Sequence, residues 1–251
     1  MTIALRIDGP APGRSGEQPL TCAGTLDGST YRRLRDIVIN AALEEPPIVI
    51  VDVNALHAPD ASAWSVFTSA HWHVRTWPDV PIVLVCSDPT TCDTLRRTGI
   101  TRHVPVYRTV ADARTACGTG QNRRRKRARA ELPAGLGGAA RARRLVEYWL
   151  TDWSHTAMIP VAAIIASELA ENALLHTDSA PWLIIECDGD QITVAVEDAS
   201  PVPAQRREHP RSGASPVSGL AVVSALSRSW GCLPTVSGKT VWAVLGPENA
   251  L

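Results

Sequence analysis

Two polar residues, Glu168 and Asn172, stand four positions apart in the segment SELAENALLHT (residues 167–177), which has the composition of a helix. At about 100° per residue they lie about 40° apart on a helical wheel, in line with four apolar neighbours, Val161, Ile164, Ile165 and Leu175. A buried unpaired carboxylate is expensive, so it needs a partner. If the pair faces a cavity, the amide could bind a hard cation, and the carboxylate could orient or deprotonate a nucleophile. The pattern alone also fits a wide apolar stripe that Glu168 merely borders.

The first half of the chain alternates strand and helix patterns. Apolar runs at residues 46–56 and 80–87 predict buried strands, and residues 30–45 have helical periodicity. A second helix is expected to begin after an N-cap at Asp60, and a third to end at Gly99. This alternation predicts a small α/β domain.

The second half predicts helices on one side of antiparallel strands, an α+β sandwich. A β-hairpin is expected around the turn at residues 188–190. The other expected elements are helices near 139–153 and 157–176, a long loop over 201–217, a helix from Ser218 closed by Gly231, and a last strand at 238–245.

Charge divides the chain into three parts. Residues 1–116 carry 11 basic and 12 acidic side chains, residues 117–130 carry six basic and none acidic, and residues 131–251 carry 8 basic and 13 acidic. We therefore expect two domains, 1–116 and 131–251, joined by a basic linker, 117–130, that is solvated or touches the acidic second domain. Nucleic-acid binding through residues 123–129 is a weaker interpretation, because no aromatic side chain interleaves with the arginines.

The cysteine spacing and the distribution of apolar residues argue against several classes of protein. The six cysteines include no C-x-x-C pair, which argues against a zinc or redox motif. The first residues do not resemble a signal peptide, and no apolar segment was expected to approach the length of a membrane span. We therefore expect a cytoplasmic protein with no membrane partner.

The motifs SELAENALLHT, VEDASP, SGLAVV and GKTVWAVL, in this order, resemble the ATP-binding domain of the GHKL superfamily. The similarity covers residues 131–246, and it is greatest to the serine kinases that act as anti-sigma factors. The resemblance implies that Glu168 is the general base and Asn172 the magnesium ligand. It also implies that Asp198 accepts from the adenine amino group, that Gly219 belongs to the phosphate-side loop, and that Thr240 lies beside adenine.

The sequence departs from the pattern of this family at two places that bear on nucleotide affinity. Ser200 stands where the family usually has a glycine after the aspartate, and the phosphate loop keeps Gly213 and Gly219 with Pro216 between them. Both departures leave Glu168 and Asn172 intact.

Residues 18–116 resemble the STAS domain of anti-sigma factor antagonists, in LTCAGTLDGSTYRRLRDIV, VIVDVNALHAPDASAWSVF and GITRHVPVYRTVADA. The phosphoacceptor of that family matches Ser62, in Asp60-Ala61-Ser62. Ser62 is expected in the first turn of a helix capped by Asp60. As an alternative, Ser62 is an ordinary first-turn residue.

The leading hypothesis is a partner-switching regulator of transcription that binds ATP and Mg²⁺ and phosphorylates a serine of a STAS domain. Its partners would be a sigma factor, an anti-sigma factor or an antagonist, and it could form a homodimer. The alternative is a non-catalytic nucleotide-binding switch that acts only through protein contacts.

Overall fold

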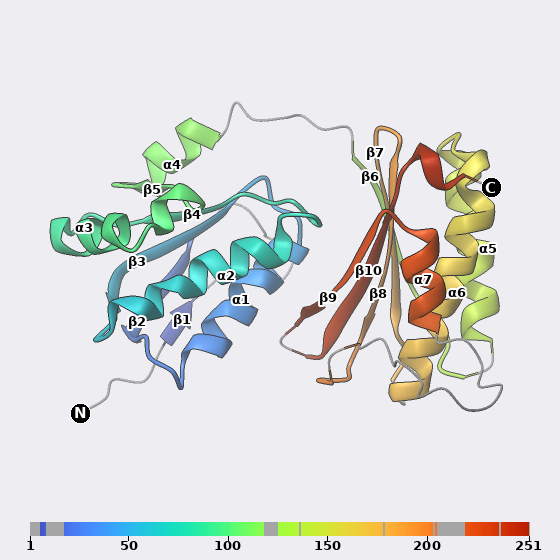
Figure 1. The fold of residues 1–251 in the computed structure, drawn as a ribbon, viewed down its shortest axis with the longest axis horizontal. Helices are drawn as coiled ribbons and strands as arrows, with labels where there is room; N and C mark the ends of the chain where they lie inside the picture. The colour runs from blue at the N-terminus through green and yellow to red at the C-terminus, as the bar shows by residue number, and fades with distance from the viewer. Residues whose placement is uncertain are drawn as a thin grey trace. The chain divides into compact units, whose positions relative to one another are not determined.

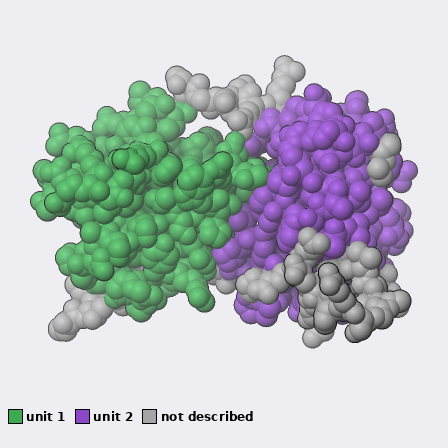
Figure 2. Space-filling model, viewed as in Figure 1, with its two compact units in different colours: residues 1–121 green, residues 122–251 purple. Residues whose placement is uncertain are grey.

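The chain divides into two compact units, residues 1–121 and 122–251 (Figure 2). The structure is a computed structural model that describes residues 6–8, 18–117, 125–135, 137–177, 179–202, 204, 219–235 and 237–250.

Unit 1 is built on a five-stranded sheet with the strand order β1-β2-β3-β4-β5. The first pair is antiparallel and the others are parallel. Strand β4 is buried at every position, as expected for a parallel strand covered on both faces. The strands are β1 (Arg6–Asp8), β2 (Leu20–Thr25), β3 (Val49–His57), β4 (Ile82–Val85) and β5 (Val106–Tyr107).

Helices cover both faces of this sheet (Figure 1). Helices α1 and α2 pack together along one face, and α4 lies on the other, where Ala113 packs with Ile50 and Val83. The α/β prediction is thus confirmed. The elements are α1 (Tyr31–Leu43), the 3₁₀ turn η1 (Ala61–Trp64), α2 (Ser65–Val74), α3 (Pro89–Arg97), the 3₁₀ turn η2 (Ile100–Arg102) and α4 (Val110–Cys117).

Unit 2 is an antiparallel five-stranded sheet with helices on one face (Figure 1). The strand order is β6-β7-β8-β10-β9, and α6 packs on β8 and β10 between α5 and α7. The bounds are β6 (Lys126–Glu131), α5 (Gly138–Asp152), η3 (Thr156–Met158), α6 (Ile159–His176), β7 (Trp182–Asp188), β8 (Gln191–Asp198), α7 (Gly219–Leu226), β9 (Ser229–Pro234), β10 (Lys239–Leu245) and η4 (Pro247–Asn249).

The basic segment is a strand rather than a linker over its last part. Residues 126–131 pair with β7 along their whole length, so this part of the predicted linker is a strand of the sheet of unit 2. The acidic partners explain the difference: Arg127 pairs with Glu186 at 3.5 Å, and Arg129 pairs with Glu197 at 2.8 Å. The expected contact with acidic surface is thus present, and residues 118–124 lie outside the described residues.

Gly231 does not end a helix as predicted. Helix α7 ends at Leu226, and Gly231 lies inside β9 opposite Trp242. A Cβ atom on Gly231 would lie 2.6 Å from the Trp242 ring, so the close approach of that ring requires glycine. Ser218 and most of the loop predicted over residues 201–217 lie outside the described residues.

Helix α6 is the core helix of unit 2, and its buried stripe differs from the predicted one. Val161 and Ile165 are fully buried, but Ile164 is 38% exposed and Leu175 is 79% exposed. Residues 156–176 are also long and apolar enough to cross a membrane by length and composition, which the sequence interpretation overlooked. Half of that window is buried inside the structure, as in the core helix of a folded domain.

Candidate functional site

Ser62 is exposed in η1, at the turn that leads from β3 into α2. Asp60 caps this turn, and its Oδ1 accepts a hydrogen bond from the Ser62 backbone N–H at 2.8 Å. Hydrogen bonds from the backbone and then the hydroxyl of Ser62 hold the pKa of Asp60 below its usual value. The predicted capping is confirmed, and the lowered pKa keeps the Asp60 carboxylate ionised at neutral pH.

A hollow of about 630 Å³ opens beside Ser62. Its other side is formed by the end of α3 and by η2, where Gly99 adopts a left-handed φ of 76° that turns the chain. The two basic residues of the lining, Arg102 and His103, come from this side. The lining residues are Ala61, Ser62, Ser65, Thr68, Thr98, Gly99, Ile100, Arg102 and His103.

An aromatic cluster adjoins the hollow through His103. The side chain of Trp72 is 46% exposed, its ring centroid lies 5.1 Å from that of His103, and the Arg75 guanidinium lies 4.4 Å from the Trp72 centroid. Burial, and then the positive potential of His103 and Arg75, lower the pKa of His71. Trp64 and Trp77 are buried, so Trp72 alone of the three tryptophans of this region faces solvent.

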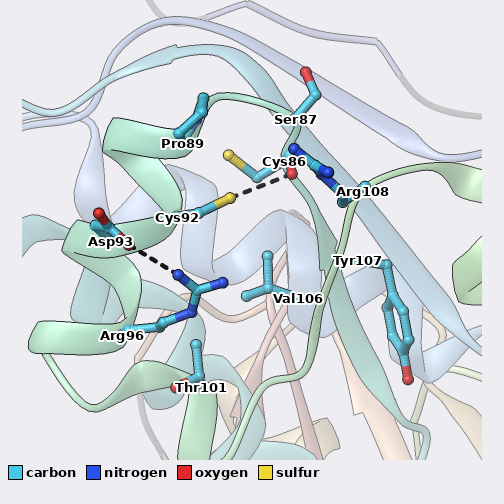
Figure 3. A pocket seen from close by; sticks show the side chains of 10 residues that line it. All are labelled: Cys86, Ser87, Pro89, Cys92, Asp93, Arg96, Thr101, Val106, Tyr107 and Arg108. Atoms are coloured by element: carbon cyan, nitrogen blue, oxygen red, sulfur yellow. Dashed lines mark hydrogen bonds and ion pairs between the residues drawn. The ribbon is translucent and has the colours of Figure 1, made fainter.

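A second hollow in unit 1, of about 680 Å³, lies at the carboxyl end of β4 (Figure 3). The Cys92 thiol donates to the Cys86 carbonyl oxygen at 3.4 Å, and Arg96 pairs with Asp93 at 2.8 Å. Burial raises the pKa of Cys86 to about 12, so this thiol is not a nucleophile at neutral pH.

In unit 2, Glu168 and Gly219 lie together. A Cβ atom on Gly219 would lie 2.5 Å from the Glu168 Oε2 atom, so only glycine fits at the start of α7 without moving the carboxylate. Burial, and then the negative charge of Glu171, raise the pKa of Glu168. A carboxylate with a raised pKa is a stronger base once ionised. Asn172 is half-buried one turn later on α6.

Asp198 is almost fully buried and forms an ion pair that the sequence interpretation missed. Its Oδ1 accepts from the Lys239 ammonium at 2.9 Å and from the Ser200 backbone N–H at 2.8 Å. The Lys239 and Asp198 side chains are 3% and 1% exposed. The second oxygen, Oδ2, is buried with no hydrogen-bond partner in the described part of the chain.

Thr240 lies on the other face of the sheet from Asp198. Lys239 is directly opposite Asp198 in the strand register, and Thr240 is opposite Glu197. Because side chains alternate along a strand, Lys239 faces the helices and Thr240 faces away from them. The structure therefore brings Lys239, rather than Thr240, to Asp198. The only signal for it in the sequence was a lysine at the start of an apolar strand.

No cluster of three or more His, Cys, Asp or Glu side chains within the described ranges could hold a metal ion. Magnesium in nucleotide sites is held mainly by phosphates with one or two protein oxygens. The Asn172 amide could serve as such an oxygen, and the expected role of Asn172 as a magnesium ligand stays a prediction.

Residues 12–113 match the family model of the STAS domain. No curated protein matches the chain. A solved anti-sigma factor antagonist from Mycobacterium paratuberculosis is similar at 18% identity with a TM-score of 0.38, over 47% of this chain and 95% of that one. The RsbU and RsbW domains of a Mycobacterium tuberculosis protein are similar at 20% identity with a TM-score of 0.37, over 48% of this chain and 32% of that one.

The family match covers strands β2 to β5, helices α1 to α3 and the start of α4, including Ser62 and both hollows. Beyond it, the chain carries the additional sheet and helices of unit 2. The N-terminal region of this chain is a STAS domain.

Proposed function

We propose that this protein is a partner-switching regulator of transcription in which the STAS domain carries the phosphoacceptor, Ser62. The observation that supports this most directly is an exposed serine in a STAS domain, in a turn whose N-cap is the ionised carboxylate of Asp60. A dianionic phosphate at an exposed position changes the charge of the surface that a partner meets. The partner would be an anti-sigma factor, an antagonist or a sigma factor.

We further propose that unit 2 has the GHKL fold, binds ATP with Mg²⁺ and phosphorylates such a serine. Asp198 would accept from the adenine amino group through Oδ2, which is buried and has no hydrogen-bond partner among the described residues. The backbone at Gly219 would approach the phosphates, and Asn172 would supply an oxygen to the metal. Bound ATP supplies the phosphoryl group that is transferred.

Glu168 would act as the general base. In the transfer, the bond between the γ-phosphorus and the bridging oxygen breaks, and ADP keeps the electron pair. A bond forms between that phosphorus and the serine Oγ, and the serine proton passes to the Glu168 carboxylate. Serine is a weak nucleophile at neutral pH, so the step requires both a base and correct placement.

A non-catalytic switch is the second candidate, and one observation favours it. Lys239 and Ser200 already occupy Oδ1 of Asp198, which leaves a single oxygen for a nucleotide base. In that case unit 2 would bind nucleotide weakly and act through protein contacts.

Two measurements on the full chain distinguish these functions. Calorimetry with ATP and Mg²⁺ tests binding, and incubation with γ-labelled ATP, alone and with a separate STAS protein, tests transfer. The kinase predicts that wild type labels a serine and that Glu168→Gln binds ATP without labelling. ATP binding without labelling of any STAS protein would support the non-catalytic switch and reject the kinase. No heat of binding at millimolar nucleotide would reject both the kinase and the nucleotide-binding switch.

A cytoplasmic location and a possible homodimer remain predictions that follow from this role. The basic strand β6 is engaged with the acidic strands of its own unit, so nucleic acid is not proposed as a partner.

A further inference from the structure

The hollow beside Ser62 combines hydroxyl groups with positive charge. Ser62, Ser65, Thr68 and Thr98 line it, and its basic lining residues are Arg102 and His103. Two of the hydroxyls are already engaged: that of Thr98 donates to the Thr94 carbonyl oxygen at 2.9 Å, and that of Ser65 lies 3.3 Å from the Tyr31 hydroxyl. Arg102 is exposed and forms no ion pair within the described ranges.

The charges around Ser62 are arranged asymmetrically. The Asp60 carboxylate lies next to Ser62 in the same turn, and it would repel a phosphate on that serine. The Arg102 guanidinium and the His103 imidazole lie across the hollow, on η2 and the residue that follows it. A phosphate dianion on Ser62 therefore lowers its energy by turning away from Asp60 and towards Arg102 and His103.

We propose that this hollow binds the phosphoryl group of phosphorylated Ser62, with the Arg102 guanidinium and the His103 imidazole as its partners within the same domain. The proposal rests on the proposed function, which makes Ser62 the phosphoacceptor. A guanidinium suits this role because its planar fork donates two parallel hydrogen bonds to phosphate oxygens. His103 adds positive charge when it is protonated, and its ring is already positioned against Trp72.

The binding links the phosphate to the exposed aromatic surface. Because His103 lines the hollow and also contacts Trp72 and His71, a phosphate held there becomes part of the same surface. A partner that contacts Trp72 would thus meet a different charge and a differently held His103 after phosphorylation.

The test uses the full chain with phosphoserine inserted at position 62 during translation, so that no kinase is required. Phosphorus NMR follows the second ionisation of the phosphate, whose pKa is about 6 in a free phosphoserine. Arg102→Gln should raise this pKa by about half a unit relative to wild type, because an exposed ion pair is lost. Arg102→Lys keeps the charge without the fork and should give an intermediate value.

Arg97→Gln is the matched control. Arg97 is an exposed arginine at the end of α3, five positions from Arg102, that does not line the hollow. Its removal should leave the phosphate pKa unchanged. The proposal would be overturned if the phosphate had the same pKa in wild type and in Arg102→Gln. It would also be overturned if Arg97→Gln shifted the phosphate pKa as much as Arg102→Gln does, because the effect would then come from the net charge of the domain and not from a contact in the hollow.

The outcome is separable from the proposed function. A shifted phosphate pKa together with failed ATP labelling would retain this site and reject the kinase step. Successful labelling of Ser62 with no effect of Arg102→Gln would retain the kinase and reject this site. The unfolding transition of unphosphorylated Arg102→Gln checks that the exposed substitution leaves the domain folded.

Discussion

Removing Lys239 should strongly destabilise unit 2. Its ammonium lies 2.9 Å from Asp198 Oδ1, and both side chains are almost completely buried. Replacing one member of such a pair leaves an unpaired buried charge, which costs about 3–5 kcal/mol. For a unit of this size the total free energy of unfolding is about 6–20 kcal/mol, so Lys239→Met removes a large part of it.

The double variant should recover most of that loss. Asp198→Asn alone leaves a buried ammonium without its counterion, whereas Asp198→Asn with Lys239→Met removes both charges and leaves an amide that can still accept from Ser200. Replacing a whole buried pair is often close to neutral, so we expect a coupling free energy of at least about 2 kcal/mol.

Scanning calorimetry of the full chain measures this, because the transition of unit 2 should fall by roughly 10–20 °C in each single variant. The transition of unit 1 serves as an internal reference in the same scan. If both single variants unfold within about 1 kcal/mol of wild type, or if their costs simply add, the two groups do not form a buried pair.

The remaining predictions concern three other side chains. Because the folded state raises the pKa of Glu168, ionisation of this carboxyl destabilises the fold, and the stability of wild type falls as pH rises through that pKa. Thermal unfolding should therefore show Glu168→Gln to be more stable than wild type at pH 7 and equal to it near pH 4. Because the folded state lowers the pKa of His71, the protein should lose stability as pH falls below about 6.5, and His71→Gln should reduce that slope in unfolding measured between pH 7 and 5. A steeper slope in the variant would contradict the cause given. Gly219→Ala should displace the Glu168 carboxylate, so labelling by γ-phosphate should fall while calorimetric unfolding changes little; unchanged labelling would show that the carboxylate position is not critical.

The STAS domain was predictable from the sequence because its central strands are strongly apolar. Strand β4 and the first five residues of β3 are largely buried on both faces, and their continuous apolar pattern has few alternatives. The Asp60 cap was also predictable, since a short polar side chain before a helical segment is a local signal.

Strands β6 and β9 could not be found in this way. The polar face of β6 is stabilised by Glu186 and Glu197, which are distant in sequence, so its arginines resembled a solvated linker. Gly231 resembled a helix stop, whereas its role is to admit the Trp242 ring. Both depend on tertiary contacts rather than on local propensity.

The candidate site in unit 2 was partly predictable. The motif order brought Glu168 and Gly219 into one site, and the structure has them in contact distance. Lys239 was missed because its partner is set by strand register, which a single-residue shift reverses. The same register separates Thr240 from Asp198.

The central claim is that unit 2 phosphorylates a STAS serine, and Ser62 is the site in this chain. The most direct measurement is phosphopeptide mapping by mass spectrometry after incubation of the full chain with ATP and Mg²⁺, with Glu168→Gln run in parallel. The account predicts phosphate on the peptide that contains Ser62 in wild type, or on the equivalent serine of an added STAS protein, and none in Glu168→Gln. Equal phosphorylation by wild type and by Glu168→Gln would contradict it. So would the absence of phosphate from every STAS serine after incubation with wild type.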